Sequence, residues 1–166
     1  MKTSSAASLT LLLLSLGMAA SAIPAHAVQP TAQPSGEAAA QSMLPKVHDA
    51  LWSKLVKCEV SYDNKAGTFG IHITPEVKAL DSQVITVRGF VLPMDGSDRT
   101  RHFLITRNTP VCQFCPPGEP NEVVEVRTPH AVEWTDQIMT VRRKLHLVND
   151  EEKAFFFKIE NAEVKQ

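Results

Sequence analysis

The sequence has little net charge and few aromatic residues. Its 166 residues carry a formal net charge of −1, with 17 Lys and Arg against 18 Asp and Glu. Nucleic acids and anionic membranes attract strongly basic surfaces, so this balance argues against both as partners. A single tyrosine also leaves few of the aromatic rings on which unpaired bases stack. We therefore expect no nucleic-acid binding.

The chain also lacks the short motifs that accompany common catalytic sites. It contains no His-Glu-x-x-His metal motif, no glycine-rich phosphate loop and no supported Ser-His-Asp arrangement. The charged segments 94–101 and 148–153 are typical of solvated turns, and the first lacks the full ligand spacing of a calcium loop. The sequence thus favours a non-catalytic role.

Long apolar runs are absent beyond the N-terminus. Residues 9–20 are mostly apolar, follow a single lysine, and form too short a run to cross a bilayer comfortably. An Ala-His-Ala tripeptide that ends at residue 27 offers the small residues that a signal peptidase reads. We predict that residues 1–27 are a signal peptide cleaved before Val28, with Ala20-Ser21-Ala22 as a second candidate site and an uncleaved anchor as the alternative. The expected location is the bacterial periplasm, and the mature chain is not expected to span the membrane.

The mature chain is predicted to hold one domain. Residues 28–41 are small, polar and proline-bearing, and we expect a flexible leader because they cannot bury enough apolar area to offset their ordering entropy. Residues 42–166 are then a single domain. Apolar residues recur at helical spacing over 42–57, which predicts one N-terminal helix whose first turn accommodates Pro45.

After this helix the apolar period changes to two, which predicts strands. A glycine lies in the middle of the long segment 83–93, and such a glycine often marks a bend of the kind that barrel corners need. Regular turns without long crossover helices indicate a mainly β protein, a small antiparallel barrel of five to seven strands. The spacing of the last two strands resembles the final hairpin of an oligonucleotide/oligosaccharide-binding (OB) barrel. The predicted strands cover 68–74, 83–93, 102–107, 121–127, 137–148 and 154–164.

Cysteine is scarce, and two of the chain's three cysteines form a Cys-x-x-Cys pair, Cys112 and Cys115. Two thiolates at this spacing can reach one ion, and soft sulfur favours zinc or cuprous copper. Further ligands would come from elsewhere in the barrel. We consider His102, on the strand that leads into the loop, and His146, on a late strand. His72 and Cys58 are further candidates.

Two other interpretations of this pair stay open. In a redox site of the thioredoxin type, a helix would follow the cysteines and lower the thiol pKa; the Pro-Pro-Gly-Glu-Pro segment that follows Cys115 cannot continue a helix. Cys112 and Cys115 could instead form a structural disulfide, or either could pair with Cys58, since export exposes thiols to oxidation. The prolines of the loop, including Pro116 and Pro117, stiffen it, and a stiff loop could present both cysteines, Asn121 and Glu122 to a partner at a low entropy cost.

Several segments together resemble a known family. These are Gly89-Phe90-x-Leu92-Pro93, a strand at 103–105, and the loop from Cys112 through Pro116, Pro117 and Pro120 to Asn121-Glu122. They are similar to an uncharacterised family, a domain of unknown function, of small exported bacterial proteins. Its members share a Gly-Phe-x-x-Pro strand and a Cys/Pro-rich loop that ends in Asn-Gln or Asn-Glu.

The resemblance also has a departure and an implication. Many relatives carry a histidine two residues after the first cysteine, where this chain has Phe114, and Cys115 stands in for it. Some relatives are encoded near parts of ATP-driven transporters linked to metal supply. The resemblance therefore implies an accessory role in a metal-linked ABC-type transport system. We expect an exported binding protein that handles zinc or copper through Cys112 and Cys115. The alternative is a structural or redox-active disulfide in a protein-interaction module.

Overall fold

The computed structural model describes residues 39, 43–111 and 117–165. The expected signal peptide and nearly all of the expected leader lie outside these residues, as do Cys112, Cys115 and Pro116. The described elements, in chain order, are α2 Trp52–Leu55, β1 Glu59–Asp63, β2 Thr68–His72, α3 Pro75–Lys78, β3 Val84–Pro93, β4 Arg99–Thr106, η1 Pro120–Glu122, β5 Val123–Glu133, β6 Met139–Asp150, β7 Phe155–Ile159 and β8 Glu163–Lys165.

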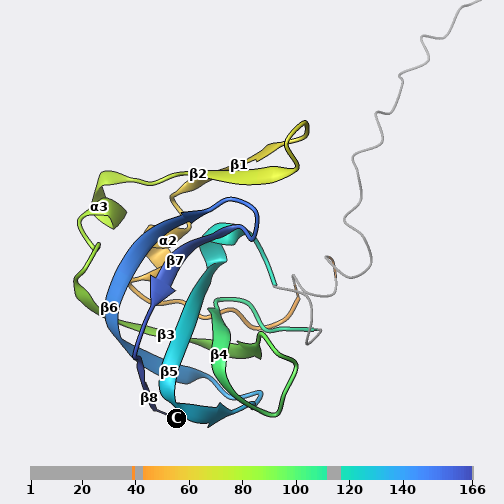
Figure 1. Ribbon diagram of the computed structural model, residues 1–166, viewed down its shortest axis with the longest axis vertical. Helices are drawn as coiled ribbons and strands as arrows, with labels where there is room; N and C mark the ends of the chain where they lie inside the picture. Colours follow the sequence, from red (N-terminus) through yellow and green to blue (C-terminus); the bar gives the residue numbers. More distant parts are fainter. Residues whose placement is uncertain (1–38, 40–42, 112–116, 166) are drawn as a thin grey trace, which may run out of the picture. The chain divides into compact units, whose positions relative to one another are not determined.

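Five strands close into a barrel, which confirms the predicted mainly β fold (Figure 1). Their order is β3-β4-β5-β7-β6, and pairing of β3 with β6 closes the sheet. The barrel pairings are antiparallel except that of β5 with β7, which is parallel. The short strand β8 continues the sheet beyond β6. It is separated from β7 by a break at Asn161, where φ is 51°.

The predicted bend in the long strand is confirmed at Gly89. Residues Val84–Gly89 of β3 pair with β6, whereas Phe90–Pro93 pair with β4. A Cβ at position 89 would lie 2.5 Å from the carbonyl oxygen of Thr106 and 2.8 Å from Cγ1 of Ile105. Only glycine fits here without backbone movement, and this lets the strand pass from one partner to the other.

The N-terminal helix is present but much shorter than predicted. Helix α2 covers only Trp52–Leu55. Asp49 ends the preceding extended segment, because its Oδ1 accepts the backbone N–H groups of Leu51 and Trp52 at 3.0 and 2.9 Å. Before Asp49 the chain lies along the end of β4 instead: the Val47 N–H donates to the Arg107 carbonyl at 2.8 Å.

Two apolar clusters lie on opposite faces of the sheet. The main core fills the barrel and includes the fully buried Trp52 of α2. A smaller cluster of Leu92, Leu104, Val123 and Phe155 is buried separately. Side chains alternate across a strand, and the neighbours Phe103 and Val124 face the main core, so Leu104 and Val123 lie on the outer face of the barrel.

A hairpin that the sequence did not fully predict projects from the barrel (Figure 1). Among the described residues, strands β1 and β2 pair only with each other, and the rings of Tyr62 and Phe69 make a tilted contact across them, with centroids 4.9 Å apart and planes at 53°. The Phe69 N–H donates to the Glu151 carbonyl at 3.2 Å, which ties the hairpin to the turn between β6 and β7. No helix in the described part of the chain is long and apolar enough to cross a bilayer.

Candidate functional site

The Cys/Pro-rich loop closes at a narrow neck made by residues at both of its ends. Arg107 and Asn108 follow β4 directly, and Glu122 ends the short helix η1 just before β5. The Asn108 amide donates to the Pro117 carbonyl at 3.3 Å, so the two ends of the intervening segment are joined. We call Arg107, Asn108, Pro117, Gly118 and Glu122 the neck.

The carboxylate of Glu122 is the centre of the neck. Its Oε1 accepts from Nη1 of Arg107 at 2.6 Å, and its Oε2 accepts from Nδ2 of Asn108 at 2.8 Å. The same Oε2 accepts the backbone N–H of Glu119 at 3.2 Å, which completes a capping box on η1. The Arg107 and Glu122 side chains are only 19% and 13% exposed. One partly desolvated carboxylate thus joins both ends of the loop.

Asn121 fixes the loop to the N-terminal part of the domain. Its side-chain amide donates to the Cys58 carbonyl at 2.8 Å, and the residue is 9% exposed. Cys58 itself is buried in the main core and carries a free thiol. The pairing of Cys58 with Cys112 or Cys115, considered from the sequence, is therefore not formed.

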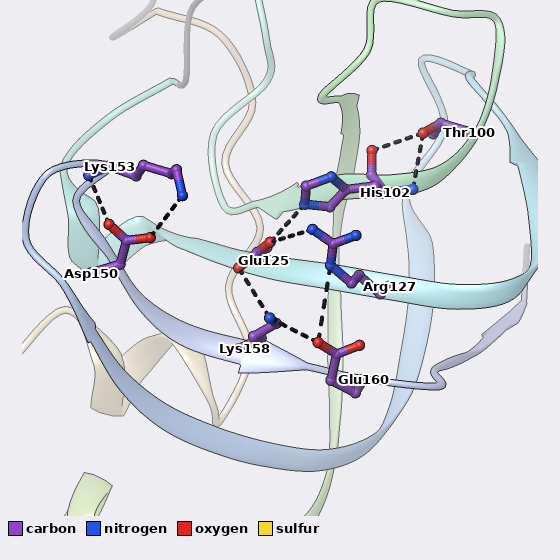
Figure 2. A network of polar contacts seen from close by, with 8 residues as sticks. All are labelled: Thr100, His102, Glu125, Arg127, Asp150, Lys153, Lys158 and Glu160. Atoms are coloured by element: carbon purple, nitrogen blue, oxygen red, sulfur yellow. Dashed lines mark hydrogen bonds and ion pairs between the residues drawn. The ribbon is translucent and has the colours of Figure 1, made fainter.

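His102 lies on the outer face of β4, in a network of charged side chains (Figure 2). Its Nε2 is 2.6 Å from Oε1 of Glu125, and the Glu125 side chain is only 11% exposed. Arg127 and Lys158 also approach Glu125, at 3.6 and 4.0 Å. Thr100 fixes the backbone of His102, because its hydroxyl donates to the His102 carbonyl and accepts the His102 N–H.

The structure does not bring His102 and His146 together. His146 lies on β6 beside Lys158 of β7, and Lys158 is in turn beside Glu125 of β5. Strands β5 and β7 therefore lie between the two histidines along this side of the barrel. The described residues contain no group of three or more His, Cys, Asp and Glu side chains suited to hold a metal.

A turn between β6 and β7 adds fixed negative charge beside this network. The Lys153 backbone N–H donates to Oδ1 of Asp150 at 3.1 Å, and this bond lowers the pKa of Asp150 below its ordinary value (Figure 2). The Lys153 ammonium group contacts Oδ2 of the same carboxylate at 3.2 Å. Asp150 is therefore ionised at neutral pH.

Comparison with known proteins agrees with the resemblance seen in the sequence. A family model described as a protein of unknown function, DUF3299, matches residues 26–157. The chain belongs to the DUF3299 family. No curated protein matches the sequence, and no solved structure matches the chain.

Sequence reasoning missed three of the five neck residues in this DUF3299 protein. Arg107, Asn108 and Gly118 were not among the predicted site residues, although Gly118 stands in a proline-rich turn where a positive φ is common. The sequence did single out Pro117, Asn121 and Glu122. All three pack onto the barrel domain instead of facing a partner: Pro117 and Asn121 are buried, and Glu122 is half-buried.

Gly118 provides a direct test of the neck of this DUF3299 domain. Its φ is +93°, and an added Cβ would lie 2.3 Å from both the Asn108 amide nitrogen and Oε2 of Glu122. We expect Gly118→Ala to destabilise the protein by about 1–3 kcal/mol through backbone strain alone, and further by displacing the carboxylate. Urea unfolding monitored by tryptophan fluorescence measures the change.

The matched control for this variant is Gly67→Ala in the β1–β2 turn. Gly67 also has a positive φ, +71°, but the nearest heavy atom to its Cβ would be 4.0 Å away. Gly67→Ala introduces the backbone strain without the steric collision, so Gly118→Ala should lower the free energy of unfolding by more. Equal losses in the two variants would show that the neck yields to a methyl group.

Proposed function

We propose that this protein is an exported, non-catalytic binding protein that carries a thiophilic metal ion on Cys112 and Cys115. The ion is cargo rather than a permanent part of the fold. Zinc and cuprous copper fit best, because thiolates are soft ligands and two of them at this spacing can reach one ion.

The closed neck is the observation that carries this proposal. Glu122 joins residues on both sides of the cysteine segment, at 2.6 Å to Arg107 and 2.8 Å to Asn108. A loop with fixed ends has few conformations to lose when it binds, so two ligands within it bind an ion at a lower entropy cost than ligands on a free chain.

The state of Cys58 adds support. The chain has three cysteines, and the Cys58 thiol is free and buried in the core. Cys112 and Cys115 are consequently the two cysteines available for a two-thiolate site. Neither histidine is needed in such a site: His102 is held by Glu125 at 2.6 Å, and His146 lies on β6, with β5 and β7 between it and β4.

An incomplete ligand set is what a carrier requires. A structural zinc site uses four protein ligands and retains its ion, whereas two thiolates leave coordination positions for a receiving protein. We therefore propose that the recipient is a component of a metal-linked ABC-type transport system in the periplasm, with the cysteine loop as the point of transfer.

Metal analysis and thiol counting test this function. Protein purified from the periplasm without chelator is expected to carry about one zinc or copper ion per chain, and Cys112→Ser and Cys115→Ser are each expected to lose it. Cys58→Ala is the matched control and is expected to keep the ion, since its sulfur is sealed in the core.

The main alternative predicts different results in the same experiment. Oxidation outside the cytoplasm favours a Cys112–Cys115 disulfide. In that case the purified protein would be metal-free, would show one reactive thiol after denaturation, and would show three after reduction as well. This result would show that the pair is a structural disulfide and not a metal carrier. A bond that exchanges readily with small thiols would indicate a redox role instead.

A further inference from the structure

An apolar groove lies beside the neck, on the outer side of the barrel. Val123 and Phe155 of the outer cluster line it, together with Pro120 of η1, Phe69 of β2 and Ala154 of the β6–β7 turn. Its volume is about 270 Å³, which is the scale of one large apolar side chain rather than of a cofactor.

Both walls of the groove are fixed before any partner binds. The Phe69 N–H donates to the Glu151 carbonyl at 3.2 Å, so the hairpin and the β6–β7 turn hold each other. The capping box of Glu119 and Glu122 holds η1 on the other side. A preformed apolar groove loses little entropy on binding.

The same turn carries unpaired negative charge next to the groove. Glu151 and Glu152 are exposed and line an open hollow of about 660 Å³ with Asp150, Glu125 and Lys158. The nearby cations are already paired, Lys158 with Glu160 and Lys153 with Asp150. Neither Glu151 nor Glu152 forms an ion pair in the described part of the chain; the Glu151 carboxylate accepts the Asn149 amide, at 2.8 Å. Glu152 and Ala154 are two residues apart, so both features lie within reach of a few residues of extended chain.

We propose that this groove docks an extended segment of a partner protein through one apolar side chain, with a nearby Lys or Arg of that segment held by Glu151 and Glu152. The charge of the turn selects a basic neighbour over an acidic one. The apolar contact supplies most of the affinity, because fully desolvated anchors dominate interfaces. This docking does not depend on metal binding, although it would bring a recipient close to the cysteine loop.

Peptide titration followed by amide chemical shifts tests the proposal. The probe is acetyl-Gly-Phe-Gly-Arg-Gly-amide, added to the ¹⁵N-labelled full chain. Saturable shifts are expected at Phe69, Gly118 and Lys153–Phe155. Replacing the peptide's Phe by Ala should weaken binding about tenfold or more. Replacing its Arg by Glu should weaken it about twofold to fivefold at low salt.

Two protein variants and one control make the test specific. Ala154 has a φ of 57°, which asparagine tolerates, so Ala154→Asn places a polar side chain in the groove and should abolish binding. Glu151→Gln with Glu152→Gln should remove the preference for Arg over Glu. Ala131 lines a different hollow, so the control variant Ala131→Asn should bind the peptide normally.

Three outcomes would overturn the proposal. The first is the absence of saturable shifts at the groove residues. The second is equal binding of the Phe and Ala peptides. The third is concentration-dependent shifts at the groove without any peptide, because a second copy of the chain would then be the occupant. None of these outcomes bears on metal occupancy of Cys112 and Cys115, so the two proposals fail separately.

Discussion

Trp52→Ala is expected to lower the free energy of unfolding by about 3–5 kcal/mol, which is the usual cost of deleting a large buried aromatic ring. Trp52 is 1% exposed and belongs to the main core. Its Nε1–H also donates to the Arg88 carbonyl at 2.6 Å, directly before the bend at Gly89. Loss of the ring therefore removes apolar burial and leaves that carbonyl without its partner. Urea unfolding monitored by far-ultraviolet circular dichroism measures the change.

Two variants separate the causes. Trp52→Phe keeps most of the ring but not the donor, and should cost about 1–3 kcal/mol. Trp134→Ala is the control, because Trp134 is 43% exposed in the β5–β6 connection and surface changes usually stay within about 0.5 kcal/mol. A loss at Trp134 as large as that at Trp52 would contradict the assignment of Trp52 to the core.

The barrel was predictable because its signals are local. Alternating apolar residues predict the barrel strands, and Gly89 predicts the corner at which β3 changes partner. The parallel pairing of β5 with β7 was not predictable, since it depends on how distant strands meet. The observed order, with β3 beside β6, is the order that closes the sheet.

The N-terminal helix was predicted to be too long because the spacing of apolar residues does not show which partners the backbone hydrogen-bonds with. Val47, Leu51 and Leu55 are all buried, as the periodic pattern predicts. The backbone of Lys46 nevertheless forms a bridge with Asn108, and Val47 pairs with Arg107. Contacts with a segment some sixty residues away in the chain decide the conformation here, and no local propensity contains that information.

The candidate site was predicted in part. The sequence identified Asn121 and Glu122 as parts of the loop, with presentation to a partner as their interpretation. Their side chains instead point to the protein, one to the Cys58 carbonyl and the other to Arg107 and Asn108. Arg107 reads as an ordinary strand end in the sequence, because only the fold places it opposite Glu122.

Glu122→Ala is the second substitution with a large expected effect. It removes the acceptor for Arg107, for Asn108 and for the backbone N–H of Glu119 at once. Arg107 is left as a largely buried, unpaired charge, and breaking such a pair typically costs about 3–5 kcal/mol. We expect a loss of this size in urea unfolding. Glu122→Gln should cost less, about 1–3 kcal/mol, because it keeps the shape but replaces one acceptor oxygen by a donor.

The exposed pair of Arg99 and Glu133 is the matched control. Its side chains are 68% and 72% exposed and approach only to 3.8 Å, so Glu133→Ala should cost at most about 1 kcal/mol. If Glu122→Ala proved as mild, the neck would not hold the loop, and the entropic argument for a preorganised pair of thiolates would fail with it. If the loss is large, metal occupancy of the folded Glu122→Gln variant should fall although both cysteines remain, because a loosened neck raises the entropy cost of bringing the two sulfurs to one ion.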